Sequence, residues 1–225
     1  MSARVVAAWQ RIETWLRAHA PVSAETILPP VDEGVLAAAE AQLYAAHGHG
    51  FPEELKALWR RCGGVEWVDV EEDEDGDLAA YEFLDYVLLG PGDAVQARGS
   101  WESLAGGAAG EASCPVADWV PWLGADNDAP DSGRYISPSG GGGWAYYEGA
   151  ELGEPTEFSS VAHYLEAVAD AFEHGTGALM SRPEPNRHVP GVVHGALIWA
   201  HIDHPYGIPD GWQPLHPLPD DFRVN

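Results

Sequence analysis

The sequence predicts an α+β fold: N-terminal helices, a central mostly antiparallel or mixed sheet, a closing helix, and a Pro/His-rich C-terminal extension. Three observations lead to this prediction. Apolar residues recur at helical spacing in the N-terminal third, alternate as in strands further on, and return to helical spacing after residue 158. With 225 residues, 45% of them hydrophobic, the chain can bury a core. We expect one domain over residues 1–178 and an extension, residues 179–225, that packs on it.

Three helices are expected in the N-terminal third. The first spans residues 3–19 and stops before Pro21, which cannot continue a helix. The second begins at Asp32, a typical N-cap residue, and ends near Gly48. The third, within FPEELKALWRRCGG (51–64), is the best specified, because proline opens it, acidic residues fill its first turn, arginines lie near its end and glycine stops it.

Four stretches after these helices predict strands, because their residues alternate in polarity or are mainly β-branched and aromatic. They are VEWVDV (65–70), YEFLDYVLLG (81–90), DWVPWLGAD (118–126) and RYISPSGGGGWAYYEG (134–149). The proline in the third stretch places that strand at a sheet edge or a bulge. The fourth stretch predicts two short strands joined by a glycine-rich turn.

Two further helices and a docked tail complete the expected fold. A short helix is expected around residues 93–98, followed by a loop of small residues, 103–113. SSVAHYLEAVADAFEHG (159–175) predicts the closing helix, capped by one of its two leading serines and ended by its last glycine. In the extension, the apolar residues 197–199 are expected to dock on the domain, in the manner of an added strand.

The charge of the chain restricts its partners. It has 36 acidic residues against 11 lysines and arginines, a net charge of −25. The phosphates of DNA, RNA and anionic membranes repel such a chain, so we expect no nucleic acid and no membrane among its partners. A basic protein partner fits this charge through electrostatic steering, although solubility alone also explains an acidic composition.

We expect a cytoplasmic protein. Cys62 and Cys114 are isolated thiols, as is usual in a reducing compartment, and their spacing predicts no zinc knuckle. Charged residues interrupt the N-terminal stretch, which therefore lacks the apolar run of a secretory signal. No run of about 18 apolar residues is present, so the sequence predicts no membrane span.

The most acidic stretch, EEDEDGDLAAYE (71–82), follows the ligand order of a calcium-binding EF-hand loop. An EF-hand needs a helix on each side, whereas the residues that flank this stretch are strand-like, so we expect no calcium site. A solvated turn and a partner-facing surface both remain as interpretations, and the same holds for a second acidic group in a later loop. The candidate partner-binding residues are Glu71, Glu72, Asp73, Glu74, Asp75, Asp77, Asp126, Asp128 and Asp131.

We expect no catalytic residue, no cofactor and no metal site. The chain has no G-x-S-x-G, P-loop or H-E-x-x-H motif. Zinc needs three or four ligands held by defined structure, which the proline-rich extension does not predict. A metal-dependent hydrolase that uses the Asp or His clusters is the enzyme hypothesis, and no complete set of catalytic groups supports it. The histidines of the extension are His188, His194, His201, His204 and His216.

Several motifs occur in a fixed order over residues 5–176. They are W..IE.WL from Trp9, AAEAQL with Glu40, FPEELKALWRRCGGV, WVPWLGADND, GGGWAYYEG and FSSVAHYLEAVADAF. In this order they resemble the SUKH superfamily of cell-wall-synthesis-regulator-like proteins, many bacterial members of which are immunity proteins. Cys62 stands where the family commonly has an asparagine before the turn glycine, and residues after 177 have no counterpart in it.

The resemblance implies a non-enzymatic binding scaffold. The function that it implies is an immunity protein that neutralises a cognate toxin, and the charge of the chain indicates a basic toxin domain. A regulatory scaffold in cell-wall or housekeeping signalling is the alternative, since fungal relatives act in cell-wall signalling. A fold does not fix its partner, so the sequence leaves both hypotheses open.

Overall fold

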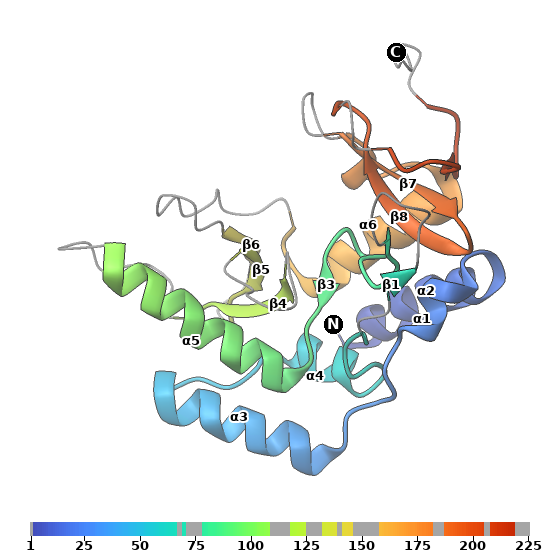
Figure 1. Ribbon diagram of the computed structural model, residues 1–225. Coiled ribbons are helices and arrows are strands. Elements are labelled where there is room, and N and C mark those ends of the chain that lie inside the picture. Colours follow the sequence, from blue (N-terminus) through green and yellow to red (C-terminus); the bar gives the residue numbers. More distant parts are fainter. Residues whose placement is uncertain are drawn as a thin grey trace. The chain divides into compact units, whose positions relative to one another are not determined.

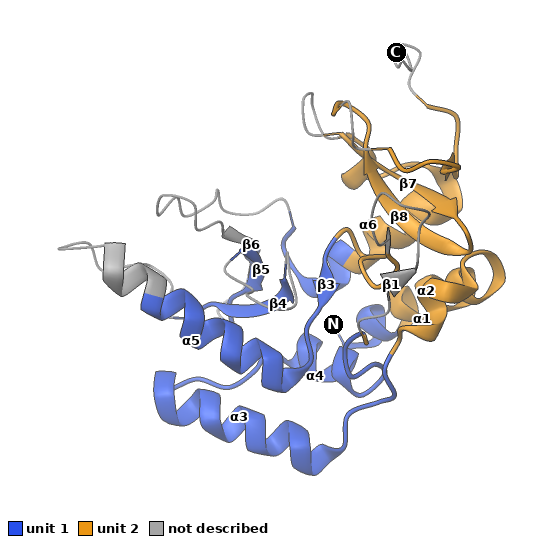
Figure 2. Cartoon of the chain, in the orientation of Figure 1, with its two compact units in different colours: residues 1–6, 28–65, 86–164 blue, residues 7–27, 66–85, 165–225 orange. Residues whose placement is uncertain are grey.

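The computed structural model describes residues 2–66, 69–70, 78–108, 118–124, 132–138, 141–145, 158–181, 187–204 and 208–218 (Figure 1). These residues form helices and antiparallel sheets, which confirms the predicted α+β class. The chain divides into two compact units (Figure 2): residues 1–6, 28–65 and 86–164 make up unit 1, and residues 7–27, 66–85 and 165–225 make up unit 2. Over the described residues, no helix has both the length and the apolar composition needed to cross a membrane.

Unit 1 combines helices with a four-stranded antiparallel sheet of order β3-β4-β5-β6. Helix α5 lies between helix α3 and the sheet, where it packs against β4 (Figure 1). The helices are α3 (Glu33–His47), α4 (Glu53–Trp59) and α5 (Pro91–Ala108), and the strands are β3 (Val87–Leu88), β4 (Val120–Gly124), β5 (Gly133–Ile136) and β6 (Gly142–Ala145).

Local side-chain chemistry sets both ends of α3, as predicted. The N–H of Gly34 donates to Oδ1 of Asp32 (2.7 Å), which caps the first turn. Gly48 ends the helix at φ 76°, a left-handed conformation that glycine adopts without a steric penalty. Between these ends, Leu36 and Leu43 belong to a buried stripe, so α3 turns its opposite face outward.

Helix α4 also follows the prediction from its sequence. Leu55, Leu58 and Trp59 are fully buried. The indole Nε1–H of Trp59 donates to the carbonyl of Leu89 (2.9 Å), which ties the helix to the residues after β3. We expected Gly63 to stop this helix, but the positive φ belongs to the next residue, Gly64, at 123°.

The strand predicted over residues 81–90 is wrong for most of that stretch, where only Val87–Leu88 pairs with a neighbouring strand. The chain turns before this strand: the N–H of Asp85 donates to the carbonyl of Glu82 (2.8 Å), and Asp85 takes a φ of 63°. Phe83 is fully buried in this turn. Burial without pairing therefore explains the strand-like composition.

Helix α5 is longer than the short helix expected around residues 93–98. It begins at Pro91 and continues to Ala108, through part of the stretch that was expected to be a loop. The N–H of Gly90 donates to the carboxylate of Asp93 (3.2 Å) at the start. The alanines of this stretch favour a helix as well as they favour a small-residue loop, and here the helix forms.

Strand β4 confirms one of the two expectations for its proline. The register with β5 shifts between Pro121 and Leu123, which is the expected bulge. The strand pairs with β3 on one side and with β5 on the other, so it does not lie at an edge. The two short strands expected within residues 134–149 are β5 and β6, which pair antiparallel.

The described residues of unit 2 form helix α2, most of helices α1 and α6, and two antiparallel sheets. One sheet pairs β1 with β2, and the other has the order β8-β7-β9. The elements are α1 (Ser2–His19), α2 (Pro21–Glu25), α6 (Val161–His174), the 3-10 helix η2 (Leu179–Ser181), β1 (Asp69–Val70), β2 (Leu78–Ala79), β7 (His188–Val193), β8 (Ala196–His201) and β9 (Gln213–Pro214).

The closing helix α6 has the ends that its sequence predicts. Oγ of Ser160 accepts a hydrogen bond from the N–H of His163 (3.1 Å), which caps the first turn. Gly175 follows the last turn at φ 64°, and its N–H donates to the carbonyl of Ala171 (3.1 Å).

The extension docks as a strand, with partners in its own sheet. Residues 197–199 lie in β8, which pairs with β7 and not with the four-stranded sheet. The N–H of Leu197 donates to Oγ of Ser23 (2.9 Å), and the indole of Trp199 donates to the carbonyl of Phe83 (2.9 Å). The β7–β8 hairpin is thus held to segments far away in sequence.

Candidate functional site

The predicted acidic residues Glu71, Glu72, Asp73, Glu74, Asp75, Asp77, Asp126, Asp128 and Asp131 all lie outside the described residues. The described strands that flank each group pair antiparallel: Val70 is opposite Leu78, and Gly124 is opposite Gly133. Strand β1 therefore ends immediately before the 71–82 stretch and β2 lies within it, whereas an EF-hand loop is flanked by helices.

The outward face of α3 is the most unusual surface in unit 1. Among the described residues, the large hydrophobic side chains that are exposed are Tyr44 (62%), on this face, and Val35 (57%), which lies on another side of the same helix. Ala37, Ala41 and Ala45 are spaced four apart and share the outward face with Tyr44. Charged or polar residues usually occupy the exposed face of a helix, whereas here Tyr44 and the three alanines form an exposed apolar strip beside Glu40.

Beside this face lies a groove of about 530 Å³, which we term the α3 groove; its lining residues are Ala37, Glu40, Ala41, Tyr44, Ala45 and Gly50. Glu40 is fixed in it, because Oε1 accepts hydrogen bonds from the N–H of Phe51 (3.2 Å) and from Nζ of Lys56 (3.0 Å). A Cβ at Gly50 would lie only 2.5 Å from the same oxygen, so the absence of a side chain there lets the carboxylate approach the backbone.

Acidic groups outnumber basic groups around α3 and α4. Nζ of Lys56 is shared between Glu40 (3.0 Å) and Glu53 (2.7 Å), and Arg60 donates to both carboxylate oxygens of Glu33 (2.6 and 3.1 Å). The hydrogen bond to Glu53 raises the pKa of Lys56 above its ordinary value, and the hydrogen bond from Arg60 lowers the pKa of Glu33. In these ion pairs, two basic side chains thus face three carboxylates.

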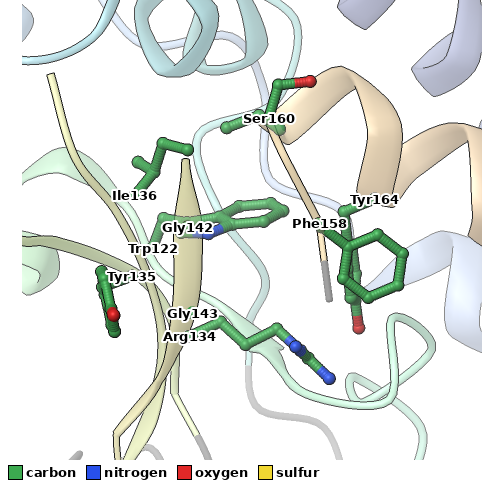
Figure 3. Close-up of a pocket in the computed structure, with 10 residues that line it drawn as sticks. Trp122, Arg134, Tyr135, Ile136, Gly142, Gly143, Phe158, Ser160 and Tyr164 are labelled. Carbon is green, nitrogen blue, oxygen red and sulfur yellow. The ribbon is translucent and has the colours of Figure 1, made fainter. Parts of the chain in front are cut away.

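A second candidate in unit 1, the surroundings of Arg134, is closed to ligands (Figure 3). The buried guanidinium carbon lies 5.0 Å from the ring centroids of Tyr86 and of Tyr164, and 5.4 Å from that of Phe158. Trp122 meets the Tyr164 ring edge-on at 5.4 Å. The cavity beside them has a volume of about 10 Å³, enough for a single water, so this aromatic cluster packs the core.

In unit 2, the structure brings some of the histidines of the extension together. His188 and His201 are opposite each other on β7 and β8, and the ring of His204 stacks on that of His201 at 5.8 Å. His194 lies in the turn between the strands, and Nε2 of His216 is 3.1 Å from the carbonyl of Phe172. Over the described residues, no group of three or more His, Cys, Asp or Glu side chains is placed to hold one metal ion.

Sequence reasoning missed two features of these sites. Asp85, which binds Nδ1 of His188 (2.6 Å), was treated as a strand residue. The α3 groove was also missed, although a signal was present: the face opposite the Leu36 and Leu43 stripe holds alanines and Tyr44 where charged residues are usual.

No protein-family model and no curated protein matches this chain.

Proposed function

We propose that this chain is a non-enzymatic protein-binding domain, and specifically a cytoplasmic immunity protein that neutralises a basic toxin domain through the α3 groove. The observation that supports the proposal most directly is the exposed apolar face of α3 beside an excess of carboxylates.

The surface has the properties of a protein-docking site. Tyr44 offers an exposed side chain with a large apolar ring and a polar hydroxyl group. Tyrosine is enriched among the residues that dominate the binding energy of protein interfaces. The small side chains beside it let a partner approach the helix backbone closely, while Glu40 supplies a fixed carboxylate within the groove. With a net charge of −25, the chain attracts a basic partner from a distance and accelerates association.

The geometry around Glu40 also supports the resemblance on which the proposal rests. Glu40 belongs to the AAEAQL motif, and its hydrogen-bond partners Phe51 and Lys56 belong to the FPEELKALWRRCGGV motif. Two motifs that are separate in the sequence thus form one hydrogen-bonded structural unit. This contact explains why position 40 is an acid, because its carboxylate accepts the backbone N–H of Phe51, just before α4 begins.

A regulatory scaffold with a cell-wall or housekeeping partner is the alternative, and it would use the same surface. The two functions differ in what the bound partner does. An immunity protein abolishes the activity of a toxin, whereas a scaffold leaves its partner active or directs it. A neighbouring gene for a large secreted protein would favour the immunity function.

The proposal is tested by purifying the tagged chain from the cells that make it, at low and at moderate salt, and identifying what accompanies it by mass spectrometry. We expect a basic toxin domain that salt releases and that kills a host cell unless this chain is co-expressed. Recovery of a wall-synthesis or housekeeping protein instead would favour the scaffold. Tyr44→Ser should weaken recovery, while Val35→Ser, which changes an equally exposed residue of α3 outside the groove, serves as the matched control.

A further inference from the structure

His188 and His201 form a cross-strand pair in unit 2. They are directly opposite in the antiparallel register of β7 and β8, where paired side chains project to the same face about 5 Å apart. Their ring centroids are 4.9 Å apart, with 48° between the ring planes. Two imidazoles at this separation can each turn a nitrogen toward one bound ion.

A buried carboxylate fixes the orientation of one ring. Oδ1 of Asp85 lies 2.6 Å from Nδ1 of His188, and the side chain of Asp85 is only 3% exposed. Because the carboxylate accepts the Nδ1–H bond, the neutral ring keeps its lone pair on Nε2. No hydrogen bond between Nε2 and any described residue is present, and the His188 side chain is 34% exposed. Nε2 is therefore available to a ligand.

The backbone of Asp85 is part of this arrangement. Asp85 has a φ of 63°, in the left-handed region that non-glycine residues seldom adopt. The turn that imposes this conformation lies 103 residues before His188 in the sequence. The contact between the carboxylate and the ring therefore depends on the tertiary fold and not on local sequence.

There is open space beside His188 with room for a hydrated ion. A cavity of about 180 Å³ borders His188, with Leu179, Val189 and Ile202 among its apolar walls. Arg187 also lines it, but its charge is matched by Asp203, which accepts from Nη2 (2.6 Å), from Nε (2.9 Å) and from the backbone N–H (2.9 Å). Among the described contacts of the His188 ring, the carboxylate of Asp85 places a negative charge on the side of Nδ1.

We propose that His188 and His201 bind a divalent transition-metal ion, such as Zn²⁺, Ni²⁺ or Cu²⁺, with Asp85 orienting His188 from behind. Imidazole nitrogen is a preferred ligand of these ions, and a carboxylate on the far nitrogen of a metal-binding histidine is the usual supporting contact. The described residues offer no third side chain already in place. The site therefore uses two protein ligands and leaves its other positions to water or to a group from another molecule. This inference goes beyond the proposed function and does not depend on it.

The test is calorimetric titration of the full chain with zinc chloride and with nickel chloride, at an ionic strength that suppresses loose binding to acidic surface. We expect one site of micromolar affinity, and an affinity at least about 10-fold lower in His188→Gln and in His201→Gln. His174→Gln, at an exposed histidine of the same unit, is the matched control and should bind as the wild type does. Binding that is unchanged in both pair variants, or absent from the wild type at millimolar ion, overturns the proposal.

Asp85→Asn tests the supporting contact separately. Asparagine tolerates the left-handed backbone and still accepts a hydrogen bond, so the turn should survive while the negative charge is lost. Affinity should fall about 10- to 100-fold, and an unchanged affinity removes Asp85 from the site.

A measurement on the unmodified chain covers the case of a variant that fails to fold. Traces of paramagnetic Cu²⁺ should broaden the imidazole NMR signals of His188 and His201 before those of other histidines. Earlier broadening elsewhere contradicts the assignment.

Discussion

Truncation of two adjacent residues of α3 should lower stability by very different amounts, because one is buried and the other faces outward. Leu43 is 1% exposed and Tyr44 is 62% exposed. Leu43→Ala removes three buried carbons, at about 0.8 kcal/mol each, and leaves a cavity, so it should lower the free energy of unfolding by about 3 kcal/mol. Tyr44→Ser removes a ring that is mostly in water, and the two residues have similar helix propensities, so its cost should stay below about 1 kcal/mol.

The assay is urea unfolding of both variants and the wild type, followed by far-ultraviolet circular dichroism. A cost of about 3 kcal/mol or more for Tyr44→Ser would refute the reasoning, because the ring would then be part of the packed core and the α3 groove would not be a free surface. A cost below about 1 kcal/mol for Leu43→Ala would refute the inward orientation of the buried stripe.

Three further outcomes are expected. Gly133→Ala should destabilise the fold by at least about 3 kcal/mol in urea unfolding, because its backbone has a φ of 153° and an added Cβ would overlap a backbone carbonyl. Gly50→Ala should cost less, about 1–2 kcal/mol, because the added Cβ would displace the Glu40 carboxylate from its hydrogen bonds without meeting the backbone. The hydrogen bonds from Arg187 lower the pKa of Asp203 below its ordinary value of 3.8. The pair therefore stabilises the fold fully above pH 3.8, and this stability is lost as the pH falls below that value. In acid unfolding, the free energy of unfolding of Asp203→Asn should not show this decrease. Replacing four acids of residues 71–77 with Ser or Asn should slow partner association and reduce its salt dependence, as measured by stopped-flow mixing.

Elements whose ends depend on neighbouring residues could be predicted from the sequence. Asp32 and Gly48 bound α3 through contacts within a few residues, and Ser160 and Gly175 do the same for α6. Capping chemistry is local, so a pattern of a few letters contains the information.

Features that depend on distant contacts could not be predicted in this way. The turn at Asp85 ends in a bond to His188, and the indole of Trp199 reaches the carbonyl of Phe83 across 116 residues. The composition of residues 81–90 resembles that of a strand, because burial favours the same apolar and aromatic residues as strand pairing does. The candidate sites divide in the same manner: the outward face of α3 could be inferred from helical spacing, but the pairing of His188 with His201 required the register of two strands.

The measurement that tests the central claim most directly is a titration of the partner's toxic activity with the purified chain. If the chain is an immunity protein, activity should fall linearly and vanish at one chain per toxin, and Tyr44→Ser should require an excess. A toxin that keeps its full activity when saturated with the chain, in a complex shown to form, would contradict the proposed function.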